Sequence, residues 1–317
     1  FDPSLSLLLA GYTGYRQRVL QAVSHTSDEL LRAAVPTCLT SLKERYQAAD
    51  LILFDSYGIL NLGAEAVAGM PQTIARLKKT GKQVRVLTNN ASLNGAGIAE
   101  FLGCMGYDFH ESEIVTCGHA LKTYMRKFHL EGSNVFCIGP KASFQYVWEA
   151  DGIPVNRPNT LGRWEEADLV VLASNGEMDE AQYQTAKQLL SNGVRTVCLN
   201  ADIVAPASAT RLSETMGSVA LQLERECGKS IEMLGKPFPW IFDTALRPFM
   251  SLPSHKILMV GDSLFTDALG AVAAGLTAVL APSAIPFASS DKSILEFCRE
   301  AGIHPHYYVE SLSALCI

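Results

Sequence analysis

The sequence predicts an α/β fold in which a parallel sheet with crossover helices is interrupted by a second α/β domain. From residue 49 onward, strand-like and helix-like segments alternate, which is typical of parallel strands joined by helices. The strand-like segments are continuous apolar runs, as expected for strands buried on both faces. The motifs that carry chemistry lie in residues 49–90 and 231–267, and a long stretch with its own αβ pattern separates them. One sheet domain with an insertion explains this order most simply.

The predicted elements follow from these runs in chain order. The strands are expected at residues 49–54, 83–87, 113–116, 134–138, 168–173, 195–199, 231–234, 255–260 and 277–280. The helices of the α/β region are expected at residues 70–79, 94–105, 181–191 and 266–274, and Gly193 and Gly275 can end the last two. Further helices are expected at residues 15–22, 28–34 and 39–47.

The domain boundaries are placed where the pattern changes. Residues 1–44 carry no motif and are expected to form a helical extension that adds a packing layer or an oligomer contact. Residues 45–120 and 230–317 are expected to form the core domain, and residues 121–229 the inserted domain. A homo-oligomer would then form through the inserted domain or the extension.

The composition excludes several classes of partner. The chain has 317 residues, of which 48% are hydrophobic and 18% charged, so it is globular and long enough for two domains. The formal net charge is −6 and no long basic run occurs, so no nucleic-acid partner is expected. No apolar run has the length of a transmembrane helix, so no membrane partner is expected.

The cysteines indicate a reducing compartment. The chain has 8 cysteines, they are scattered, and none forms a CxxC pair. Buried thiols are therefore favoured over a disulfide framework or a zinc site, and a cytoplasmic location is expected.

The functional prediction depends on four strand ends. Asp55 follows an apolar strand, and Thr88-Asn89-Asn90 ends the second strand. Gly235-Lys236-Pro237 follows a third, and Gly261-Asp262-Ser263-Leu264-Phe265-Thr266-Asp267 ends a fourth. Parallel strands present their carboxyl ends at one sheet edge, where α/β folds place ligands. Taken alone, each motif is explained by a turn, a helix cap or a surface lysine. The combination of all four in this order indicates metal-assisted phosphoryl transfer.

Each residue type suits a part of that chemistry. Asp55 is expected to attack phosphorus and form an aspartyl-phosphate, with Mg²⁺ as the cofactor that screens the anionic oxygens. The expected Mg²⁺ ligands are Asp55, the backbone carbonyl of Tyr57, and Asp262, because Mg²⁺ prefers oxygen. Asp267 and the adjacent Ser263 are expected to orient these groups from outside the metal shell.

The phosphoryl group needs further partners. Lys236 is expected to supply positive charge beside Asp55. The Thr88 hydroxyl and the Asn89 backbone N–H, with Asn90 beside them, are expected to bind a phosphoryl oxygen. The inserted domain is expected to close over the site and select a small phosphorylated metabolite.

On these motifs the chain resembles the haloacid dehalogenase-like (HAD) superfamily. More narrowly, it is similar to the NagD-like phosphatases, whose class, IIA, has a large α/β cap. The resemblance covers about residues 45–317 and implies a Rossmann-like core, Mg²⁺ dependence and an aspartyl-phosphate. It also implies that Asn200 and Asp202 of the cap, with a later Gly217-Ser218, face the active site.

Tyr57 departs from the family pattern. Family phosphatases usually have a second Asp two residues after the nucleophile, which protonates the leaving oxygen and then activates water. A phenol with an unperturbed pKa of about 10 is a poor substitute. Since general acid–base help contributes about 10²–10⁴-fold, the sequence predicts weakened or atypical acid catalysis.

Two alternatives remain open. Family dehalogenases often have Tyr at this position, because halide leaves without a proton, so metal-independent 2-haloacid hydrolysis is the first. Its weakness is that Gly261-Asp262 and Asp267, the metal-binding pattern, are intact. The second alternative is a catalytically poor phosphate-ligand-binding or scaffold protein, against which the retained Asp55 argues.

Overall fold

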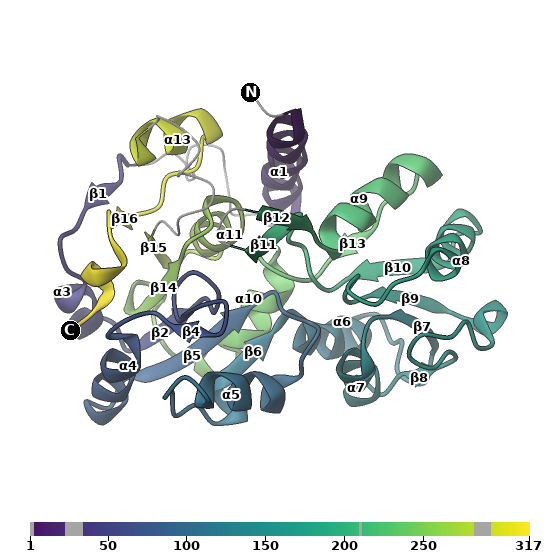
Figure 1. The fold of residues 1–317 in the computed structure, drawn as a ribbon, viewed down its shortest axis with the longest axis horizontal. Coiled ribbons are helices and arrows are strands. Elements are labelled where there is room, and N and C mark those ends of the chain that lie inside the picture. The colour runs from purple at the N-terminus through teal and green to yellow at the C-terminus, as the bar shows by residue number, and fades with distance from the viewer. Residues whose placement is uncertain (1–2, 23–33, 209–210, 282–292) are drawn as a thin grey trace.

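The computed structural model describes residues 3–22, 34–208, 211–281 and 293–317. It contains two parallel sheets of different size, each with helices packed against it, and they form the two lobes seen in Figure 1. This confirms the predicted α/β class with a parallel core sheet and a second α/β sheet.

The larger sheet forms the core lobe and has seven strands in the order β1-β16-β15-β14-β2-β5-β6. All of its neighbouring strands run parallel. The strands are β1 (Thr37–Cys38), β2 (Leu51–Phe54), β5 (Gln83–Thr88), β6 (Ile114–Thr116), β14 (Ile257–Gly261), β15 (Thr277–Leu280) and β16 (Tyr307–Tyr308). The central strand is β14, and β2 lies between β14 and β5.

Both faces of this sheet are buried, which explains the continuous apolar runs. In β2, Leu51 and Leu53 pack into one hydrophobic cluster, and Ile52 and Phe54 pack into another on the opposite face. Helices α10 (Pro239–Leu246) and α11 (Leu269–Ala273) cover the first face, and α4 (Met70–Lys79) and α5 (Gly95–Gly103) cover the second.

The second sheet forms the cap lobe and has five strands in the order β13-β10-β9-β7-β8. These strands are β7 (Asn134–Ile138), β8 (Ile153–Pro154), β9 (Leu169–Leu172), β10 (Arg195–Cys198) and β13 (Glu232–Met233). The helices of this part of the chain are α6 (Ala120–Lys127), α7 (Lys141–Glu149), α8 (Glu180–Ser191) and α9 (Met216–Cys227).

Two hairpins and three further α-helices are described besides these. The hairpins are β3 (Asn61–Leu62) with β4 (Glu65–Ala66), and β11 (Val204–Ser208) with β12 (Arg211–Glu214). The helices are α1 (Pro3–Ala22), α3 (Lys43–Ala48) and α13 (Ile294–Ala301). Figure 1 shows α1 standing at the junction of the two lobes, between α11 and α9.

The structure contains every predicted strand, with ends shifted by up to two residues, and it corrects other details. Thr37–Cys38 forms edge strand β1, so the expected extension is not helical throughout, and the helix expected at 39–47 begins only at Lys43. The helix expected at 266–274 begins with a π-helical turn, Leu264–Ala268. The expected helix at 28–34 lies outside the described residues except for Ala34.

The domain boundaries remain a proposal, although the sheets indicate where the chain crosses between lobes. The chain leaves the core sheet after β6 and enters the cap sheet at β7. Strand β13 pairs with β10, so the segment that returns to the core still belongs to the cap sheet at Met233. None of the described helices combines the length and apolar character that crossing a bilayer requires.

Candidate active site

Three of the four motif segments come together because their strands, β2, β5 and β14, are neighbours in the core sheet. Phe54 of β2 pairs with Val260 of β14, so Asp55 and Asp262 follow the two strands at the same edge. Strand β5 lies on the other side of β2 and ends at Thr88. The sheet order therefore produces the predicted convergence at the carboxyl edge for these three segments. The prediction was wrong for Gly235-Lys236-Pro237, because the strand before it, β13, pairs with β10 in the cap sheet.

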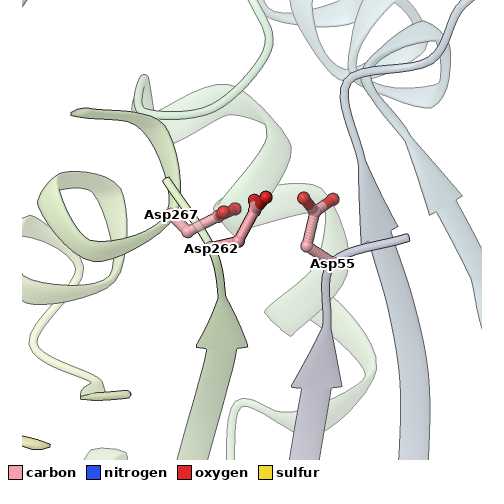
Figure 2. Close-up of side chains that lie close together, drawn as sticks. All are labelled: Asp55, Asp262 and Asp267. Atoms are coloured by element: carbon pink, nitrogen blue, oxygen red, sulfur yellow. The ribbon is translucent and has the colours of Figure 1, made fainter. Parts of the chain in front are cut away.

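Three carboxylates form a cluster at this edge. Asp55, Asp262 and Asp267 each offer one oxygen, and these oxygens all lie within 4.8 Å of one another. Figure 2 shows the side chains gathered above the ends of the two neighbouring strands. Three acids this close are costly without a compensating cation, so the arrangement favours cation binding.

The turn after Asp55 brings backbone against this cluster. Gly58 has a φ of +86°, in the left-handed region that favours glycine, and a Cβ built on it would lie 2.0 Å from Asp262 Oδ2. Its N–H donates to the carbonyl of Asn61 at 2.8 Å, which closes the turn. The close approach of the turn to Asp262 therefore requires glycine at this position.

Lys236 supplies a buried cation at the centre of the site. Its Nζ donates to Asp55 Oδ1 at 2.7 Å, to Asp267 Oδ1 at 2.6 Å and to the Leu87 carbonyl at 2.8 Å. Burial lowers the pKa of Lys236, but the charges and hydrogen bonds of Asp267 and Asp55 outweigh it and raise that pKa above its ordinary value. The ammonium therefore stays charged.

Asp55 is oriented through one of its two oxygens. Oδ1 accepts both from Lys236 Nζ and from the Ser56 N–H at 2.8 Å. In the part of the chain that the structure describes, no hydrogen bond is made to Oδ2. Burial, and next the charge of Asp267, raise the pKa of Asp55 to about 7, and Lys236 offsets this only in part. A cation bound at the cluster would favour the ionised form.

Asp267 already has both oxygens in use. Oδ1 accepts from Lys236 Nζ, and Oδ2 accepts from the Ser263 N–H at 3.1 Å. Ser263 in turn caps the π-helical turn, since its hydroxyl accepts from the Thr266 N–H at 3.3 Å. These contacts suit a role in orienting Lys236.

The Thr88-Asn89-Asn90 segment is fixed mainly by its side chains. The Asn89 amide oxygen accepts from Lys236 N–H at 2.7 Å, and its Nδ2 donates to the Lys236 carbonyl at 2.9 Å. The Thr88 hydroxyl accepts from Asn90 N–H at 3.2 Å, and Asn90 Oδ1 accepts from Ser92 N–H at 2.8 Å. The Asn89 side chain thus connects the Thr88-Asn89-Asn90 segment to Lys236. The sequence alone does not predict this connection.

Asp202 brings the cap to this site. Its Oδ1 accepts from Asn89 Nδ2 at 2.9 Å, and its N–H donates to Asn200 Oδ1 at 2.9 Å. The Gly217 N–H donates to the Asp202 carbonyl at 3.0 Å, which places the Gly217-Ser218 segment beside this loop. Burial raises the pKa of Asp202 to about 6, while Lys236 and the Asn89 hydrogen bond oppose the shift.

Tyr57 lies beside the cluster and is half-buried. Burial, followed by the charge of Asp262, raises the pKa of its phenol above the ordinary value. Proton donation works best from a group whose pKa lies near the working pH. The local environment therefore makes Tyr57 a weaker acid than an ordinary tyrosine.

The cluster suits a hard divalent cation. All of its donors are oxygens, the set that Mg²⁺ prefers, and the charge of a cation would offset the mutual repulsion of the acids. Asp55 and Asp262 remain the residues we expect to bind it, with the backbone carbonyl of Tyr57.

Two residues beside the site were missed by sequence reasoning. Tyr12 and Tyr15 of α1 contact the loop that carries Asp202. Their spacing of three residues places them on one helix face, but the same spacing is typical of ordinary core residues.

Two family models match the chain. The model described as haloacid dehalogenase-like hydrolase matches residues 52–153, and the HAD-hydrolase-like model matches residues 233–315. Together they span the four motif segments and leave residues 154–232 between them.

Relatives and solved structures agree with these matches. Glycerol-3-phosphate phosphatase of Gallus gallus is 27% identical over 284 residues, covering 84% of this chain and 90% of its own. Ribonucleotide monophosphatase NagD of Escherichia coli is 25% identical over 234 residues, covering 74% and 88%. The structure of 4-nitrophenylphosphatase from Thermotoga maritima superposes with a TM-score of 0.72 at 22% identity, covering 85% and 97%.

Proposed function

The chain belongs to the haloacid dehalogenase-like superfamily and, within it, to the NagD-like class IIA phosphatases, and on this basis we propose that it hydrolyses small phosphorylated metabolites. The reaction would depend on Mg²⁺ and pass through an aspartyl-phosphate on Asp55. The relatives named above act on a glycerol phosphate, nucleotides and an aryl phosphate. They support the substrate class without selecting one member of it.

One observation carries the proposal. Lys236 Nζ lies between Asp55 and Asp267 at 2.7 and 2.6 Å, and the oxygens of Asp55, Asp262 and Asp267 lie within 4.8 Å. The candidate nucleophile Asp55, the acids of the cluster and the buried Lys236 ammonium thus come from three chain segments and lie close together.

The first step forms a bond between an Asp55 oxygen and phosphorus. The Asp55 Oδ2 atom is the better candidate, because Oδ1 is held by Lys236 and the Ser56 N–H. As this bond forms, the bond from phosphorus to the ester oxygen breaks, and that oxygen takes up a proton. Water then attacks the aspartyl-phosphate, which releases phosphate and restores the carboxylate.

Residues around Asp55 stabilise the developing charge. Mg²⁺, when bound by Asp55, Asp262 and the Tyr57 carbonyl, would supply a Lewis acid that screens the phosphoryl oxygens. Lys236 keeps its positive charge beside the nucleophile, and Asp267 holds it there. The Thr88 hydroxyl and Asn89 N–H would bind a phosphoryl oxygen.

The proposal is tested by the turnover of para-nitrophenyl phosphate with and without Mg²⁺. We expect release of nitrophenol with Mg²⁺ and a loss of at least about 10²-fold after removal of the metal by a chelator, because screening of the anion is lost. Failure of the protein to release nitrophenol under either condition would contradict the phosphatase function. Halide release from a 2-haloacid without metal would instead favour the dehalogenase alternative.

A second experiment addresses the missing acid. Tyr57→Asp restores a carboxyl group that can protonate a poor leaving group, which an alkyl ester needs and an aryl ester does not. We expect the ratio of kcat/KM for glycerol phosphate to that for para-nitrophenyl phosphate to rise at least about 10-fold, within the usual range of general acid catalysis.

Tyr57→Phe is the matched control for this substitution. It keeps the ring and removes only the hydroxyl, so the ratio should stay within about 3-fold of the wild-type value if the phenol contributes little acid catalysis. An unchanged ratio in Tyr57→Asp would assign Tyr57 a different role, such as shaping the pocket.

A further inference from the structure

Helix α1 presents three side chains on one face to the junction between the lobes. Tyr12, Tyr15 and Arg18 are spaced three residues apart, so they lie along one side of the helix. Tyr15 is fully buried, and Tyr12 and Arg18 are partly buried. Figure 1 places this helix where core and cap meet.

The two tyrosine rings pack on the core motifs. The Tyr12 ring stacks on Phe265 with centroids 5.0 Å apart and an interplanar angle of 12°. The Tyr15 ring meets Phe238 edge-on at 5.1 Å and 72°. Phe265 lies in the chain between Asp262 and Asp267, and Phe238 lies two residues after Lys236. The rings therefore contact the segments that carry the candidate metal ligands and the lysine.

The two hydroxyl groups bind the cap instead. The Tyr15 hydroxyl donates to the Ala201 carbonyl at 2.7 Å, and the Tyr12 hydroxyl accepts from the Ile203 N–H at 3.2 Å. These backbone groups lie directly before and after Asp202. Each tyrosine thus has its ring on the core and its hydroxyl on the cap.

The loop of residues 200–203 is connected to Lys236 through the side chain of Asn89. Asp202 accepts from Asn89 Nδ2, and Asn89 makes reciprocal hydrogen bonds with the backbone of Lys236. A shift of residues 200–203 would therefore disturb the amide that fixes Lys236 beside Asp55.

Arg18 adds a second attachment to the cap. Its two Nη atoms bind the Glu224 carboxylate of α9 at 3.1 Å each, in a bidentate pair. Its guanidinium lies 5.7 Å from the centroid of the Phe238 ring, on the core side. Arg18 thus repeats the arrangement of the tyrosines, with one contact on each lobe.

We propose that α1 is a clip that fixes the cap over the core, and that Tyr12 and Tyr15 are positioning residues that hold residues 200–203 over the active site. The consequence for turnover rests on the phosphatase function proposed above. A cap held in one place presents Asp202 to small substrates at a constant distance, and it excludes substrates that need the lobes to separate.

The test uses the double variant Tyr12→Phe/Tyr15→Phe, which keeps both rings and removes only the two hydroxyls. Hydrogen exchange is measured at the Asp202 and Gly217 amides, because neither donates to a tyrosine and both report on the loop. We expect exchange at these amides to become at least about 5-fold faster, as the loop opens more often.

Steady-state kinetics form the second readout. We expect kcat/KM for glycerol phosphate to fall about 5- to 10-fold, and kcat/KM for a larger nucleoside monophosphate to fall less or to rise. A purely structural role would lower both values equally, through the amount of folded protein.

Tyr46→Phe is the matched control. Tyr46 is also fully buried, and its hydroxyl donates to the Leu315 carbonyl at 3.1 Å within the core, away from the cap. This variant should change neither the exchange of Asp202 and Gly217 nor the ratio of the two substrates.

The outcomes separate the clip from the phosphatase function. Faster exchange in the double variant, without a change in the Tyr46→Phe control, supports the clip. This result holds even if the wild-type protein hydrolyses neither substrate. Unchanged exchange together with an unchanged substrate ratio in an active enzyme would overturn the clip and leave the phosphatase function standing.

Discussion

Asp55→Asn should abolish the hydrolysis of para-nitrophenyl phosphate while leaving the fold intact. The amide has nearly the shape of the carboxylate but cannot form the bond to phosphorus, so we expect kcat to fall by at least about 10³-fold. Rapid acid quenching with ³²P-labelled substrate should trap a labelled wild-type protein and no labelled variant. The fold is checked by circular dichroism.

Asp50→Asn is the matched control, because it removes an acid at the other end of the same strand. Its side chain is 49% exposed and lies 4.0 Å from Lys82, a distance at which a surface pair contributes little. Activity should remain at the wild-type level. Equal turnover by Asp55→Asn and the wild type would exclude Asp55 as the nucleophile.

Lys236→Met should cause the largest loss of stability among the site variants. The lysine side chain is 2% exposed, and its partners Asp55 and Asp267 are 13% and 1% exposed. Removing the cation leaves two carboxylates buried without compensation, which costs about 3–5 kcal/mol when one member of a buried pair is removed. Urea unfolding in the presence of a chelator measures this loss without help from a bound metal.

Two further variants identify the cause of the loss. Lys256→Met removes a lysine whose Nζ donates at 3.0 Å to the Ala48 carbonyl at the surface, and it should cost less than about 1 kcal/mol. Adding Asp267→Asn to Lys236→Met should recover at least about 1 kcal/mol, because one uncompensated charge is removed. If the double variant is as unstable as the sum of both changes, unpaired charge is not the cause.

The buried strands could be predicted because their physical signal is strong. A strand such as Leu51–Phe54 must be apolar at every position when both faces are covered. The two-residue strands β1 and β16 carry no such signal, and their pairing depends on chain segments far apart in the sequence. The apolar run at residues 231–234 predicts strand β13 itself, but not its place in the cap sheet, which depends on its pairing with β10.

The site could be predicted where residue type and strand end coincide, as for Asp55, Lys236 and Asp262. Contacts between the two lobes could not be predicted from the sequence, because they depend on how the two domains pack against each other. The side chain of Asn89 is the example: its amide binds Lys236 and Asp202, whereas the sequence suggested only a backbone role. Helix α1 is the other, since its tyrosines look like core residues until their hydroxyl partners are known.

Strand β13 has a mechanical consequence. Met233 pairs with β10 in the cap sheet, and the Leu234 N–H donates to the Cys198 carbonyl at 2.8 Å. Gly235 is then the last residue before Lys236, which lies in the core beside Asp55. Because only Gly235 separates the cap sheet from Lys236, the connection cannot lengthen. A rotation of the cap sheet must therefore displace the backbone of Lys236. Cap position and the charge beside the nucleophile are therefore coupled through the chain itself.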